Sequence, residues 1–109
     1  MPSFEDLVAH LSCIHTTDRK RDRAYDVAGH LIKETLKERW NGLSQNNQRT
    51  LTKDAGNRLW ENYMKKRKID NLSPKDAARG AIYDEKDNLQ QIFNPEERHK
   101  NLSDQLNDF

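Results

Sequence analysis

The side chains best suited to bind a metal lie near the N-terminus: His10, Cys13 and His15 are close together, and His30 follows. Zinc takes Cys and His ligands, and His10 and Cys13 would share one face of a helix. The paired Cys and His spacing of zinc modules is otherwise missing, and a single cysteine often serves as a small buried apolar residue. We therefore expect no metal site and no cofactor.

The same residues raise the question of nucleophilic catalysis, because a Cys13 thiolate could pair with His10 or His15. The sequence supplies neither a third group to orient the base nor a loop to bind an oxyanion. Carboxylates are scattered among Lys and Arg, as on solvated helix faces. The four glycines are isolated, at positions 29, 42, 56 and 80, so no glycine-rich phosphate loop exists. We expect no catalytic residues and no enzymatic activity.

Basic residues form two clusters, RKRDR at residues 19–23 and KKRK at residues 65–68. If the helices that carry them pack antiparallel, the clusters merge into one positive end, which could bind phosphates with little sequence specificity. Alternatively, the clusters are solvated surface or pair with the acidic C-terminal residues. The candidate nucleic-acid-binding residues are basic: Arg19, Lys20, Arg21, Arg23, Arg49, Lys53, Arg58, Lys65, Lys66, Arg67 and Lys68.

Large apolar and aromatic residues are the candidates for contact with a protein partner. The three in the middle of the chain are also what a core would contain, but exposed aromatic residues anchor many interfaces. The three near the C-terminus can dock on this protein's own helices or in the groove of another protein. The candidate partner-binding residues are Trp40, Trp60, Tyr63, Leu102, Leu106 and Phe109.

The element that must position these side chains is a long helix predicted for residues 18–41. Its apolar residues recur at steps of three and four from Ala24 to Trp40, which puts them on one stripe of a helix. Gly29 is tolerated inside it at a cost of about 1 kcal/mol. We expect this central helix to be continuous and to end at Gly42 in a left-handed cap.

Three further helices are predicted from apolar periodicity and helix-start signals. The first covers residues 3–15. The next begins between residues 44 and 50 and ends at residue 68. Ser73 followed by Pro74 is a strong helix start, although the polar stretch at residues 83–88 could break or bend the helix that follows.

The predicted fold is all-α: a compact bundle of four helices plus a short C-terminal fifth helix, in a single domain of residues 1–109. Residues 94–109 form the fifth helix, which is peripheral or mobile. Small residues recur on the inward faces at Gly29, Gly56 and Gly80, and we expect them to allow close helix crossings.

Composition bounds the remaining possibilities. Charged residues make up 34% of the chain and hydrophobic residues 33%, so the core is thin or is completed by a second subunit. The single cysteine excludes a disulfide scaffold. No apolar run approaches the roughly 18 residues of a membrane span, and the acidic start is unlike a signal peptide. We expect a soluble, cytoplasmic protein without membrane association.

The sequence thus predicts a small non-enzymatic helical protein that acts by binding another protein, as a regulator, adaptor or inhibitor. The alternative is a helical, dimeric nucleic-acid-binding protein that contacts phosphates through its basic patches. A homodimer is left open under either interpretation.

Overall fold

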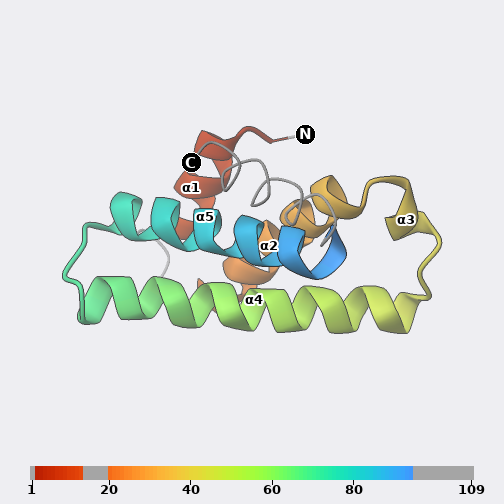
Figure 1. The fold of residues 1–109 in the computed structure, drawn as a ribbon. Helices are drawn as coiled ribbons and strands as arrows, with labels where there is room; N and C mark the ends of the chain where they lie inside the picture. Colours follow the sequence, from red (N-terminus) through yellow and green to blue (C-terminus); the bar gives the residue numbers. More distant parts are fainter. Residues whose placement is uncertain (1, 14–19, 95–109) are drawn as a thin grey trace, which may run out of the picture.

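The computed structural model of the protein describes residues 2–13 and 20–94, which form an all-α bundle (Figure 1). The helices are α1 (Phe4–Ser12), α2 (Lys20–Leu36), α3 (Glu38–Asn41), α4 (Gln45–Lys68) and α5 (Pro74–Phe93). The predicted all-α bundle is confirmed. The predicted fifth helix, with Leu102, Leu106 and Phe109, falls almost entirely outside the described residues, as do His15 and Arg19.

The core is organised around α2, which packs against α1, α4 and α5 and most extensively against α4. Its predicted apolar stripe is buried, and Val27, Leu31 and Ile32 are at most 1% exposed. Leu59 of α4 and Ile82 of α5 are fully buried in the same core. The central role predicted for this helix is therefore confirmed.

The prediction of one continuous helix over residues 18–41 is wrong at Lys37. This residue has φ 55° and ψ −123° and separates α2 from α3. Such a backbone costs an L-residue on the order of 1–3 kcal/mol and persists only where the surroundings hold it. Arg39 donates hydrogen bonds to the Phe93 carbonyl and to Asn94 Oδ1, and Gln48 Nε2 donates to the Trp40 carbonyl at 2.9 Å. These contacts hold α3 against α4 and α5.

The predicted left-handed cap at Gly42 is also wrong, because Gly42 has φ −82° and ψ −7°. Its N–H instead donates to the Arg39 carbonyl in a tight turn. Among the described residues, positive φ occurs at Lys37 and at Asn71, in the connection between α4 and α5. Both left-handed positions are therefore occupied by residues other than glycine, and Gly42 did not mark a left-handed helix cap.

The helix starts agree with the sequence at three serines. Ser3, Ser44 and Ser73 each accept a hydrogen bond from the backbone N–H three residues on, as N-cap residues do. Helix α4 begins at Gln45, the earlier of the two starts considered. Pro74 occupies the first turn of α5.

Helix α5 is uninterrupted through residues 83–88, so the predicted break or bend is absent. Two of the carboxylates in this stretch pair with cations of α4. Arg58 donates to Glu85 Oε1 at 2.9 and 3.1 Å, and Lys66 Nζ lies 3.3 Å from Asp84 Oδ2. A polar stretch therefore remains helical because it faces a charged seam on the neighbouring helix.

Helices α2 and α4 approach closely at Gly56, as predicted for a small residue at a crossing. A Cβ built on Gly56 would overlap the Tyr25 ring and lie 3.1 Å from Tyr25 Cα. Gly29 has more room, since its nearest neighbour would be Thr52 Cγ2 at 3.9 Å. These pairs also show that the two helices run antiparallel.

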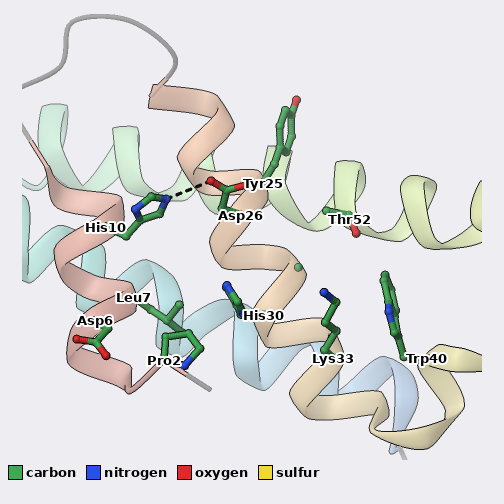
Figure 2. A pocket seen from close by; sticks show the side chains of 11 residues that line it. Pro2, Asp6, Leu7, His10, Tyr25, Asp26, His30, Lys33, Trp40 and Thr52 are labelled. Atoms are coloured by element: carbon green, nitrogen blue, oxygen red, sulfur yellow. Dashed lines mark hydrogen bonds and ion pairs between the residues drawn. The ribbon is translucent and has the colours of Figure 1, made fainter.

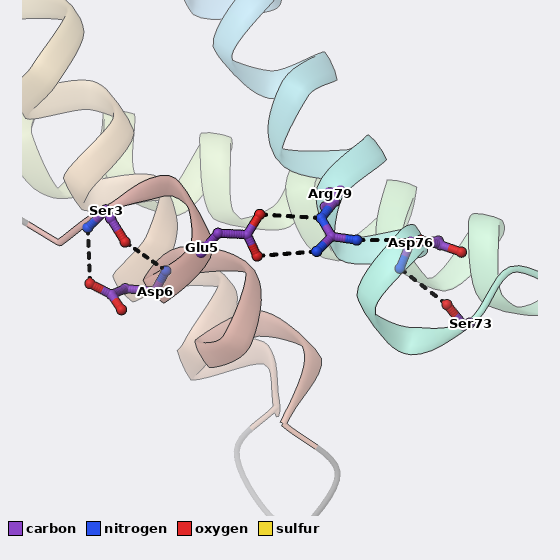
Figure 3. A network of polar contacts seen from close by, with 6 residues as sticks. All are labelled: Ser3, Glu5, Asp6, Ser73, Asp76 and Arg79. Carbon is purple, nitrogen blue, oxygen red and sulfur yellow. Dashed lines mark hydrogen bonds and ion pairs between the residues drawn. The ribbon is translucent and has the colours of Figure 1, made fainter.

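A surface network joins α1 to the start of α5 (Figure 3). Arg79 Nη2 donates to Glu5 Oε2 at 3.1 Å, and Arg79 Nη1 lies 3.5 Å from Asp76 Oδ1. Ion pairs at an exposed surface are weakened by water and salt, so they add little to stability. Their main effect is to orient α1 relative to the start of α5.

Candidate functional site

An open groove runs over the outer face of α2, between α1 on one side and α3 and α4 on the other (Figure 2). Its larger hollow has a volume of about 650 Å³ and is lined by Asp6, His10, Asp26, His30, Lys33 and Trp40, among others. A second hollow of about 580 Å³ shares Tyr25, Trp40 and Thr52 with the first and adds Gln45, Gln48, Arg49 and Lys53. We call the two hollows together the Trp40 groove.

Trp40 stands where the two hollows meet. Its position follows from the turn at Lys37, which redirects the chain into α3 and brings the indole toward α4. The ring is only partly buried against the core, and Lys33 Nζ lies 5.8 Å from its centroid. A cation at this distance over an indole face is weakly attracted to it.

Three cations surround this tryptophan, and we call Lys33, Arg49 and Lys53 the basic end of the groove. All three are exposed. Arg49 and Lys53 are one helical turn apart on α4, so they share a face. Within the described part of the chain, none of the three forms a salt bridge. The basic end therefore carries positive charge that no carboxylate within residues 2–13 and 20–94 neutralises by direct contact.

The other end of the groove carries carboxylates, and we call Asp6 and Asp26 its acidic end. Asp26 Oδ2 lies 3.2 Å from His10 Nε2, and 66% of the Asp26 side chain is exposed. Asp6 is committed to the N-cap of α1, where it accepts a hydrogen bond from the Ser3 N–H (Figure 3). Two carboxylate side chains therefore line this end of the groove, whereas three basic side chains line the other.

Of the residues considered for metal binding or nucleophilic attack, His15 lies outside the described part of the chain, and His10, Cys13 and His30 do not group into a metal site. His10 and His30 both line the groove, whereas Cys13 is half-buried beyond the end of α1. Among residues 2–13 and 20–94, no three His, Cys, Asp or Glu side chains are placed to hold a metal ion.

The structure distributes the predicted nucleic-acid-binding cations over several surfaces. Arg49 and Lys53 line the groove, but Arg58 and Lys66 face α5 and bind its carboxylates, so they are not free to contact phosphates. Arg23 donates to the His10 carbonyl, and Arg67 donates to the Leu72 carbonyl. Arg21, Lys65 and Lys68 remain exposed, and the Lys20 side chain is outside the description.

The two basic clusters lie on helices that run antiparallel, as expected. Tyr25 lies opposite Gly56 and donates to Asn57 Oδ1 at 2.7 Å, and Gly29 lies opposite Thr52. The same register puts Arg21 beside residue 60, five residues or about 7.5 Å before Lys65. Because Arg19 and the Lys20 side chain lie outside the described residues, a single merged positive end stays a prediction.

The predicted partner-binding aromatic residues have different surroundings. Trp40 borders the groove, whereas Trp60 is half-buried, with its ring 5.8 Å from that of Tyr63. Tyr63 is only 7% exposed and belongs to the core. Burial raises the pKa of the Tyr63 hydroxyl, and the nearby Arg67 offsets part of that rise.

Several groove residues were missed from the sequence, among them Tyr25 and Lys33. Tyr25 packs in the space left by Gly56, and its hydroxyl bonds to Asn57. A charged residue such as Lys33 gives no signal by itself on a helix rich in charge. Only the fold shows that it stands beside an aromatic ring contributed by a different helix.

Every helix in the described ranges is too short or too polar to span a lipid bilayer. The chain matches no protein family, no curated protein and no solved structure in the comparisons made. The Trp40 groove and its charges are therefore the features from which a function can be inferred.

Proposed function

We propose that this is a non-enzymatic helical protein that acts by binding another protein through the Trp40 groove. The observation that carries the proposal is the half-exposed Trp40 between two hollows, with Lys33, Arg49 and Lys53 around it. Trp, Tyr and Arg dominate the binding energy of protein interfaces. Here Trp40, Tyr25 and Arg49 line one continuous depression.

The distribution of charge supports a protein partner over nucleic acid. A nucleic-acid surface needs a continuous array of cations to follow the phosphates. In this protein Arg58 and Lys66 are bound to carboxylates of α5, and the groove itself ends in Asp6 and Asp26. Protein partners carry both signs of charge, so they can match such a surface.

The mechanism needs no chemical step. A bound segment would cover Trp40 and displace water from its face, which supplies affinity. The exposed cations would steer the encounter and restrict the choice of partner. Occupying the groove either occludes a surface of the partner or joins it to an assembly, which is how regulators, adaptors and inhibitors act.

The test is affinity capture after crosslinking in the cells from which the protein comes, with quantitative mass spectrometry of the captured proteins. The groove variants are Trp40→Ala and Arg49→Glu, and the matched control is Lys75→Glu, an exposed charge reversal on α5. Circular dichroism checks that each variant is folded.

We expect at least one protein to be captured by the wild type and Lys75→Glu and to be lost with both groove variants. Binding of that protein is then reconstituted from purified components. A captured set that is the same for all four proteins would contradict the proposal. Capture of nucleic acid that is lost with Arg49→Glu would favour the alternative function instead.

A further inference from the structure

The two ends of the Trp40 groove carry opposite charges, and this order restricts what it can bind. Exposed Asp26 lies at one end, paired with His10 at 3.2 Å, while Lys33, Arg49 and Lys53 surround Trp40 at the other. We propose that the groove binds a helical segment of a partner protein that carries Asp or Glu at one end, Lys or Arg at the other, and an apolar residue beside its acidic end. This inference rests on the function proposed above.

The spacing of the groove charges sets the spacing expected in the partner. Asp26 and Lys33 are seven residues apart on α2, which is about 10 Å along the helix axis. Two turns of a partner helix lying alongside α2 cover the same length. Its acidic and basic residues should therefore be separated by seven positions, which keeps both on the face toward the groove.

The basic end determines where the acidic residues and the apolar anchor must lie. Lys33 comes from α2, while Arg49 and Lys53 come from α4, so the three cations approach Trp40 from two helices. One or two carboxylates placed between them would pair with cations that have no salt bridge among the described residues. An aliphatic or aromatic side chain next to those carboxylates would then cover the exposed indole.

The same charge order disfavours a single strand of nucleic acid, which is the other ligand with flat rings and negative charge. Its bases could stack on Trp40 and Tyr25, and its phosphates could bind Arg49. A strand that continued along the groove would bring phosphates toward Asp26, whose side chain is 66% exposed. Like charges there oppose binding of a uniform polyanion, whereas a segment of mixed charge is attracted at both ends.

The experiment is selection of a displayed library of 15-residue helical peptides on the purified full-length protein. Peptides that also bind the Arg49→Glu/Lys53→Glu variant are removed. The best peptide is then synthesised with a fluorescent label. Its affinity is compared by anisotropy with that of a peptide of identical composition in which the acidic and basic residues are exchanged, and with that of a 15-nucleotide oligothymidine.

We expect the selected peptides to carry acidic and basic residues about two turns apart, with an apolar residue beside the acidic ones. The exchanged peptide should bind at least tenfold more weakly. Arg49→Glu/Lys53→Glu should weaken the selected peptide by a similar factor, whereas the Lys75→Glu control should bind it as the wild type does.

Equal binding of the selected and exchanged peptides would overturn the inference, as would tighter binding of the oligothymidine or the absence of any peptide that depends on the basic end. The two proposals can fail separately. A cellular partner lost with the groove variants, together with peptides that show no charge order, would leave the function standing and remove this inference. Ordered peptides without a groove-dependent partner in cells would remove the function.

Discussion

Gly29 on α2 faces α4, and Gly56 on α4 faces α2. Substitution of each by alanine should change the stability of the protein in opposite directions. Gly29 and Gly56 each lie inside a helix, where Ala is favoured over Gly by about 1 kcal/mol. From helix propensity alone, Gly29→Ala and Gly56→Ala should therefore be equally stabilising. The packing around the two positions predicts that only Gly29→Ala will be stabilising.

The difference comes from the space beside each Cα. A methyl group on Gly29 would meet Thr52 Cγ2 at 3.9 Å, an ordinary van der Waals contact, so the gain of about 1 kcal/mol should be kept. A methyl group on Gly56 would overlap the Tyr25 ring and lie 3.1 Å from its Cα, so α2 or α4 must shift. Overpacking of this kind costs about 1–3 kcal/mol or somewhat more. After the helix-propensity gain of about 1 kcal/mol is subtracted, the net effect of Gly56→Ala should be a loss of up to about 2 kcal/mol.

Urea and thermal unfolding of the two variants and the wild type, followed by circular dichroism, measure these changes. For a domain of about 100 residues, 1 kcal/mol corresponds to roughly 4–8 °C in Tm. Gly29→Ala should raise Tm by about that amount, and Gly56→Ala should lower it. If Gly56→Ala were as stable as Gly29→Ala, Tyr25 would not pack against Gly56 and the reasoning would be refuted. In a double-mutant cycle, Gly56→Ala should cost less stability in a Tyr25→Ala background than in the wild type, because the smaller side chain removes the overlap with the ring.

Three further predictions concern single side chains. Arg58→Ala should destabilise the fold by about 2–3 kcal/mol, because it leaves the buried Glu85 carboxylate without its partner. Glu85→Gln should lower the free energy of unfolding by less than Arg58→Ala does, since the half-exposed Arg58 can turn to water. Urea titrations of both variants measure this, and a larger loss for Glu85→Gln would contradict the pairing. Lys37→Gly should stabilise by about 1 kcal/mol in thermal unfolding, because glycine adopts φ 55° without strain; a loss of stability would show that the turn is unstrained. Because burial raises the pKa of Tyr63 above its ordinary value of 10.0, the unfolded chain loses this proton first, and stability should fall as pH rises above about 10. Tyr63→Phe should flatten that fall in urea titrations at pH 9 and 11, and an unchanged slope would disprove the effect.

Much of the fold could be predicted because its signals are local. The apolar stripe from Ala24 to Leu36 is buried as expected, and Ser3, Ser44 and Ser73 cap helices where the sequence placed them. Periodicity and capping depend on residues within one or two turns of each other. Such features do not need the other helices to be recognised.

The errors arose where distant residues changed the outcome of a local preference. Residues 83–88 were expected to break or bend a helix, but Glu85 and Asp84 among them pair with Arg58 and Lys66 of α4. The helix predicted through Lys37 is interrupted because Arg39, Trp40 and Gln48 make contacts that hold α3 in its own direction. In both places, hydrogen bonds between helices outweighed the preference of the segment itself.

The candidate site depended on the tertiary structure to a greater degree. The types of its residues were evident, since Trp40, Arg49 and Lys53 were all considered as binding residues from sequence. Which of them share a surface was not evident. From sequence, Arg58 was expected on the same surface as Arg49 and Lys53, but it faces α5. The sequence by itself determined an all-α chain with one apolar stripe per helix, since that pattern is set by helical period. The tertiary structure decided which cations surround Trp40, because the register and direction of α2, α3 and α4 determine which side chains share a surface.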